Sequence, residues 1–165
     1  MKKLLVLLAV VPVVAFASST FAADATNNLT VDAVVMADCS VTSGAIHFGN
    51  YNPITTSSDT SASGDFTVYC TKGTAVHIGM GEGANYSGAR RMKNGTSNFL
   101  TYGLFKEGSH ENAWGDTLSA DRVAIASTAG TSGNEKTVYG MLPKNQDQPA
   151  GAYSDEVAIN VWIDA

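Results

Sequence analysis

The sequence beyond Cys39 predicts an antiparallel β-sandwich. In several short segments, apolar residues recur at every second position, which is the period of a half-buried strand. Clusters rich in Gly, Asn, Ser and Pro separate these segments, and no segment has a helical period. Two cysteines in early segments, Cys39 and Cys70, can join two of the strands through a disulfide.

The chain begins with the features of a secretory leader. Lys2 and Lys3 precede an apolar run at 4–16, and the small residues of 20–22 supply a cleavage site. The run is shorter than the ~20 apolar residues that span a bilayer. We therefore expect a signal peptide over residues 1–22, and not a membrane anchor, and export to a bacterial periplasm.

The charge balance argues against two classes of partner. Loss of Lys2 and Lys3 with the leader leaves 10 − 2 = 8 basic residues against 15 acidic ones, a formal charge of −7. Nucleic acids and anionic membranes require clustered Lys and Arg. The one basic cluster, Arg90, Arg91 and Lys93, is expected in a solvated loop, so we predict neither partner. The length allows one domain and no second one.

An amphipathic segment lies just behind the leader. Leu29, Val31, Ala33 and Val35 occupy alternate positions, so an extended backbone would carry all four on one face. The opposite face begins with polar residues. A flexible tail needs no such stripe, so we expect a strand that inserts into a sheet.

The two cysteines are expected to pair. Extracytoplasmic proteins use disulfides, and the spacing of Cys39 and Cys70 fits neither a metal pair nor a redox CxxC motif. Closing a loop of this length removes roughly 3–4 kcal/mol of unfolded-state entropy in the chain-entropy model.

The remaining strands follow in chain order. Alternation predicts them around Ile46 and Phe48 and at 66–70, 76–80, 100–105, 138–142 and 157–163, with 123–125 as a candidate. Loops are expected at 55–63 and 83–98. The last strand ends two residues before the C-terminus, so no later residues cover its outer edge, which is an aggregation hazard.

Several segments in order carry a family resemblance. They are Cys39-Ser40-Val41, Phe48-Gly49-Asn50-Tyr51-Asn52-Pro53, Gly64-Asp65-Phe66-Thr67-Val68-Tyr69-Cys70-Thr71-Lys72-Gly73, Arg91-Met92, Leu100-Thr101-Tyr102-Gly103-Leu104-Phe105, Trp114-Gly115-Asp116, Val138-Tyr139-Gly140-Met141-Leu142-Pro143 and Gly151-Ala152-Tyr153-Ser154-Asp155. Together they resemble the spore coat protein U domain, the family of the subunits of archaic (Csu-type) chaperone–usher pili.

The resemblance implies an immunoglobulin-like sandwich that lacks its final strand. A periplasmic chaperone first fills the open groove, and in the pilus the N-terminal extension of the next subunit replaces it, at an outer-membrane usher. By this resemblance residues 39–165 form the domain, and 23–38 form the extension and its linker. The inserting side chains would be Leu29, Val31, Ala33 and Val35, and Ala33 would bind weakly because it is small. The groove would be lined by Ile46, Phe48, Val157, Ile159, Val161 and Ile163.

The linker makes insertion into the chain's own groove unfavourable. Residues 36–38 alone separate the stripe from Cys39, so a stripe that folds back would run antiparallel to the first strand. The missing strand of such a sandwich runs parallel to the first strand. We therefore expect an assembling protein that reaches the cell surface as a fimbrium or is secreted.

No catalytic or cofactor-binding pattern stands out. His47, His77 and His110 are scattered, and no metal-binding motif includes them. We predict a structural protein without a cofactor that serves adhesion and biofilm formation. A secreted spore or cell-surface coat protein is the alternative, as is a minor adhesin that binds sugar through Trp114 and Tyr86.

Overall fold

The computed structural model describes residues 25, 27–42, 44–55, 58–117 and 119–164. These residues divide into an N-terminal segment that ends at Val34 and a compact body that begins at Val35. The predicted leader, residues 1–22, lies outside the described residues. In the N-terminal segment, the described residues carry no helix and no strand.

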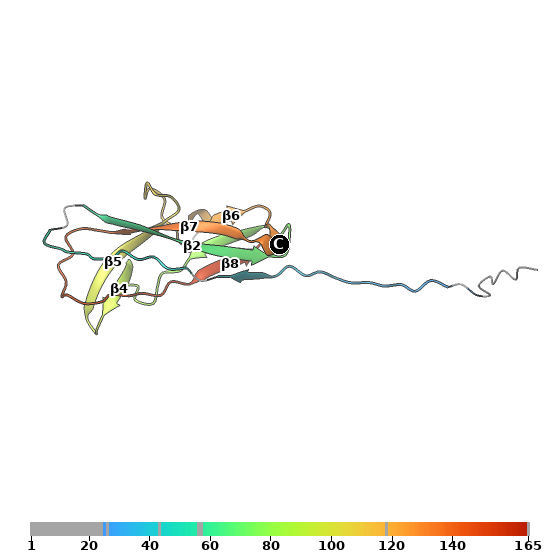
Figure 1. The fold of residues 1–165 in the computed structure, drawn as a ribbon, viewed down its shortest axis with the longest axis horizontal. Coiled ribbons are helices and arrows are strands. Elements are labelled where there is room, and N and C mark those ends of the chain that lie inside the picture. Colours follow the sequence, from blue (N-terminus) through green and yellow to red (C-terminus); the bar gives the residue numbers. More distant parts are fainter. Residues whose placement is uncertain (1–24, 26, 43, 56–57, 118, 165) are drawn as a thin grey trace, which may run out of the picture. The chain divides into compact units, whose positions relative to one another are not determined.

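The body is built from antiparallel strands and two 3-10 turns. The strands are β1 (Cys39–Val41), β2 (Thr60–Cys70), β3 (Val76–Met80), β4 (Arg90–Asn94), β5 (Asn98–Phe105), β6 (Val123–Ile125), β7 (Asn134–Leu142) and β8 (Ile159–Ile163). The turns cover Ser119–Asp121 and Gly130–Ser132. One sheet has the order β1-β2-β7-β5-β4 and the other has the order β6-β3-β8 (Figure 1). The predicted all-β class with antiparallel sheets is confirmed.

The core lies between the two sheets. Alternate residues of β2, β3 and β5 are buried, among them Val68, Ile78 and Leu104. Trp114 is 1% exposed, and its indole Nε1 donates a hydrogen bond of 2.9 Å to the carbonyl of Ile78. Because its backbone N–H also donates to the carbonyl of Leu104, this residue links the two sheets. The sugar-binding role considered for Trp114 is therefore excluded by its burial.

The prediction of a loop at 83–98 is wrong in part. β4 occupies Arg90–Asn94 and forms a hairpin with β5, and Gly95 at the turn has a φ of 65°. Arg90 sits at a half-buried position because its guanidinium donates to the carbonyls of Gly81, Met80 and Trp114 at 2.7–2.8 Å. A search for alternating apolar residues cannot detect a strand with such a residue.

The predicted first strand around Ile46 and Phe48 is also wrong. The first strand is β1, whose Cys39 lies opposite Cys70 of β2, and residues 45–50 belong to no strand. The backbones of Gly44 and Asp65 approach so closely that a Cβ at Gly44 would overlap the Asp65 carbonyl. The segment therefore stays beside β2 after β1 ends, but without ladder pairing.

Two strand boundaries differ from the predictions. β2 begins at Thr60, inside the predicted Ser/Thr-rich loop, because its polar first half pairs with the end of β7, with Thr60 opposite Leu142. β8 begins at Ile159, and not at Val157. The three-residue β6 confirms the candidate strand at 123–125.

Candidate functional site

Each sheet has an edge strand at one flank of the body. β8 pairs with β3 and β1 pairs with β2, and within the described residues neither has a ladder partner on its other side. These two edges lie close together (Figure 1). Unpaired backbone N–H and C=O groups at such an edge can bind a further strand.

An apolar groove of about 380 Å³ opens beside these edges, between residues 44–48 and residues 153–159. Ile46 and Phe48 line one side, Val157 and Ile159 line the other, and the floor belongs to the core. The floor residues are Phe66, Met80, Tyr102, Leu104 and Val138. Four of the six predicted groove residues therefore lie together, and an apolar side chain placed there would lose its contact with water.

The other two predicted groove residues lie outside this lining. Val161 is half-buried against the core, and Ile163 is 41% exposed. Both belong to β8, farther along the edge. A second hollow of about 970 Å³ adjoins the groove, because Ile46, Phe48 and Tyr153 are among the residues that line both.

Gly140 of β7 allows Ile46 and Phe48 to pack against the sheet. A Cβ at this position would lie 2.8 Å from Cζ of Phe48 and 3.2 Å from Cγ2 of Ile46. The ring of Phe48 also packs against Tyr102, with 6.3 Å between ring centroids. A segment outside every ladder thus still presents its apolar side chains at a fixed place, because a glycine opposite leaves room for them.

Asp155 holds the other side of the groove in position. Its carboxylate accepts hydrogen bonds from the hydroxyl of Tyr102 at 2.7 Å, and from the backbone N–H and side-chain amide of Asn85 at 3.2 and 2.8 Å. Burial, and then this hydrogen bond, raise the pKa of Tyr102 well above its usual value. The neighbouring Ser154 exchanges backbone hydrogen bonds with Lys93 of β4. Residues 153–157 are therefore fixed although they form no long strand.

The amphipathic segment exposes its apolar side chains to water. Leu29 is 88% exposed, Val31 and Val35 are each 82% exposed, and Ala33 is also exposed. We refer to residues 27–36 as the arm. Val34, on the other face of the predicted strand, is equally exposed and interrupts the polar character of that face. Contiguous exposed apolar side chains are typical of a surface that binds a partner.

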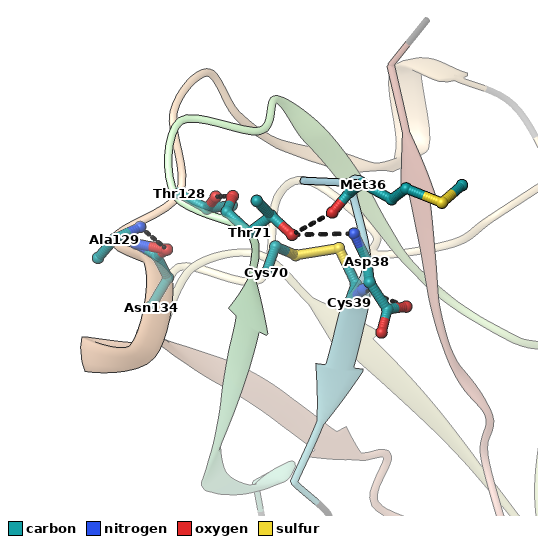
Figure 2. Close-up of a disulfide and its surroundings, with 8 residues drawn as sticks. All are labelled: Met36, Asp38, Cys39, Cys70, Thr71, Thr128, Ala129 and Asn134. Carbon is teal, nitrogen blue, oxygen red and sulfur yellow. Dashed lines mark hydrogen bonds between the residues drawn. A yellow bond between two sulfur atoms is a disulfide. The ribbon is translucent and has the colours of Figure 1, made fainter. Parts of the chain in front are cut away.

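The linker between the arm and β1 ends at the disulfide. Cys39 and Cys70 form the predicted bond, with 4.1 Å between their Cα atoms. Figure 2 shows the disulfide with the linker beside Thr71, whose hydroxyl bonds to the backbone of both Met36 and Asp38. Sequence reasoning did not identify Thr71, Asp155 or Gly140, although all three lie within the segments that carry the family resemblance.

Within the described residues, no group of three or more His, Cys, Asp or Glu side chains could hold a metal ion. The three histidines lie apart: His47 is exposed, His77 bonds to Asp164 at 2.7 Å, and His110 packs on the ring of Phe105. No helix in the described part of the chain is long and apolar enough to span a membrane. The groove and the arm are therefore the features on which a function can be argued.

Two comparisons of the sequence with known proteins identify its family. The family described as Spore Coat Protein U domain matches residues 25–160. Protein U of Myxococcus xanthus is 32% identical over 156 residues, which cover 85% of this chain and 86% of that protein.

A solved structure has a similar fold. It is a chain of the CsuC–CsuE chaperone–tip adhesion subunit pre-assembly complex from archaic chaperone-usher Csu pili of Acinetobacter baumannii, with a TM-score of 0.50 and 23% identity. The match covers 77% of this chain but spans only 40% of the solved chain. At this identity, the likeness concerns the fold alone.

Proposed function

Because the chain belongs to the Spore Coat Protein U domain family, we propose that it is a structural subunit of an archaic chaperone–usher pilus. In this proposal, subunits polymerise by donor-strand complementation, a form of strand addition in which the arm of one copy fills the groove of the next. The observation that carries the proposal is an apolar groove beside two unpaired sheet edges, in a chain that also exposes an apolar stripe on its arm.

The expected free energies of the interaction support a stable joint without covalent bonds. Transfer of Leu29, Val31, Ala33 and Val35 from water into an apolar groove would contribute on the order of 5–10 kcal/mol. Backbone hydrogen bonds to the edge of β8 would each add roughly 1 kcal/mol net. Ala33 has the smallest side chain of the four and would contribute least.

The proposal assigns a role to each part of the chain. Residues 1–22 would direct export to the periplasm, residues 23–38 would supply the donor strand and linker, and residues 39–165 would accept a strand. Until polymerisation, a periplasmic chaperone would occupy the groove, and an outer-membrane usher would then pass the subunit to the surface. The complex from which the similar solved structure comes pairs a chaperone with a subunit, which is the arrangement proposed here. We propose adhesion and biofilm formation as the role of the fibre.

Deletion of the arm tests this function. A chain that lacks residues 27–36, produced beside a candidate chaperone, should still fold and bind the chaperone but form no fibres in electron micrographs. The matched control removes residues 23–26, which lie outside the apolar stripe, and should polymerise. Fibres from the arm-deleted chain would contradict the donor-strand proposal.

A coat protein is the second candidate. The family description and the likeness to Protein U favour it, and the same groove and arm could join subunits in a coat. Genes for a chaperone and an usher beside this one would favour a pilus, whereas sporulation-linked expression without them would favour a coat. The third alternative, a sugar-binding adhesin, loses one of its two aromatic residues because Trp114 is buried.

A further inference from the structure

One hydroxyl group holds both ends of the linker between the arm and β1. The hydroxyl of Thr71 donates a hydrogen bond to the carbonyl of Met36 at 2.9 Å and accepts one from the backbone N–H of Asp38 at 3.1 Å (Figure 2). The backbone N–H of Thr71 also donates to the carbonyl of Asp38 at 2.9 Å. Three hydrogen bonds therefore fix a linker of three residues to the end of β2.

Thr71 is itself held firmly in place. It follows Cys70, which is bonded to Cys39, and its carbonyl accepts a hydrogen bond of 2.8 Å from the hydroxyl of Thr128. Thr128 is 3% exposed, and its own backbone bonds to Gly73 and Thr74. The hydroxyl that binds the linker therefore belongs to a rigid part of the body.

The linker also lacks the geometry of a hairpin turn. Short hairpin loops require one or two residues with positive φ, for which Gly and Asn are the usual residues. Residues 36–38 contain neither, and the described non-glycine residues with positive φ are His110 and Asn145. To turn the arm back toward its own body, the linker would have to change its backbone angles and release Thr71.

We propose that Thr71 is a positioning residue that prevents the arm from folding back as a hairpin and so directs it to a second copy of the chain. This inference rests on the proposed function. A three-residue linker can return the arm to its own groove only as a hairpin, because any other path is too short. By holding that linker, Thr71 disfavours a monomer whose arm fills its own groove, a form that would compete with fibre formation.

The test compares substitutions of Thr71 in the full mature chain with a matched substitution at the other end of β1. Thr71→Val keeps the shape but removes both side-chain hydrogen bonds, and Thr71→Ser retains them. The control is Thr42→Val. Thr42 makes the equivalent pair at the other end of β1, because its hydroxyl accepts from the N–H of Thr67 at 2.9 Å and donates to the carbonyl of Thr67 at 3.3 Å. It does not contact the linker.

Three measurements follow: the polymerisation rate, the hydrogen exchange of arm amides in the monomer fraction, and the binding of a labelled peptide with the sequence of residues 27–36. We expect Thr71→Val to polymerise roughly tenfold more slowly, with protected arm amides in its monomers. Thr71→Ser and Thr42→Val should polymerise like the wild type. Equal rates for all four chains would overturn the proposal.

Two other results also decide the matter. If Thr71→Val and Thr42→Val slow polymerisation equally, or if Thr71→Val unfolds earlier than Thr42→Val, then Thr71 has only a structural role and the proposal is overturned. If the wild-type chain neither polymerises nor binds the arm peptide, the proposed donor-strand function is itself wrong, and the inference about Thr71 is overturned with it. Peptide binding by the wild type therefore separates failure of the donor-strand function from failure of this inference.

Discussion

A charge on the inserting face of the arm should abolish the joint, whereas the same charge on the other face should not. Val31→Asp places a carboxylate where the proposal puts an apolar side chain, and Thr30→Asp places one on the opposite face. In the free chain Val31 is 82% exposed, so the substitution leaves the monomer unchanged. The difference between the two variants therefore reports on the joint alone.

The magnitude follows from the groove that receives the side chain. Loss of the valine removes roughly 1.5–3 kcal/mol of apolar burial. The floor contains Phe66, Tyr102 and Leu104, each less than 8% exposed, so a carboxylate would enter in its protonated form. Protonation of an Asp with a pKa of about 3.9 costs about 4 kcal/mol at pH 7. The total of roughly 6 kcal/mol corresponds to a loss of about 10⁴ in affinity.

The assay is fluorescence anisotropy of labelled arm peptides, residues 27–36, added to freshly refolded full-length chain. Thr30→Asp should bind within a few-fold of the wild-type peptide. Affinity of the Val31→Asp peptide should rise as the pH falls toward 4, because the bound carboxyl has the higher pKa and binding takes up a proton. Equal loss for both variants, or no loss for Val31→Asp, would refute the assignment of the inserting face.

Three further predictions concern the body. Replacing Cys39 and Cys70 together by serine should lower the free energy of unfolding by roughly 3–4 kcal/mol in urea titrations, since the loop between them is no longer closed; an unchanged midpoint would contradict this. Gly140→Ala should displace Phe48, because a Cβ there would lie 2.8 Å from its ring, and should weaken peptide binding more than it lowers the melting temperature. The pKa of Tyr102 is raised by burial, so stability should be independent of this group below pH 10 and fall above it. In Tyr102→Phe that fall should be smaller in unfolding curves measured from pH 9 to 11, and an identical fall would show that the phenol does not contribute.

The sequence predicts the fold class because most of the strands are half-buried. Alternation identifies the buried ends of β2, β3 and β5 directly, since every second residue faces the core. β4 has no such alternation, because all five of its residues are half-buried, and Arg90 occupies such a position by donating hydrogen bonds to three carbonyls outside the strand. Such pairing is a property of the folded chain and leaves no periodic signal.

The site could be predicted only in part for a similar reason. Ile46, Phe48, Val157 and Ile159 were found through apolar alternation and family resemblance, and they lie together in the groove. Asp155 and Gly140 were not found, because their roles depend on Asn85, Tyr102 and Phe48, which are far away in the sequence. A single sequence contains no information on such distant pairs.

In the proposed assembly, the strand order also limits how many neighbours one subunit can join. Two sheets have four edges, and the edges at β4 and β6 are poorly suited to strand addition. β4 carries Arg90, Arg91 and Lys93, and charged residues discourage edge-to-edge pairing, while β6, at three residues, is shorter than β8, the other edge of its sheet, which has five. Within the described residues, this leaves the edge of β8, beside β1, as the edge best suited to strand addition. In the proposed assembly, a subunit with one donor and one acceptor can join only two neighbours, so its products would be unbranched threads and not extended sheets.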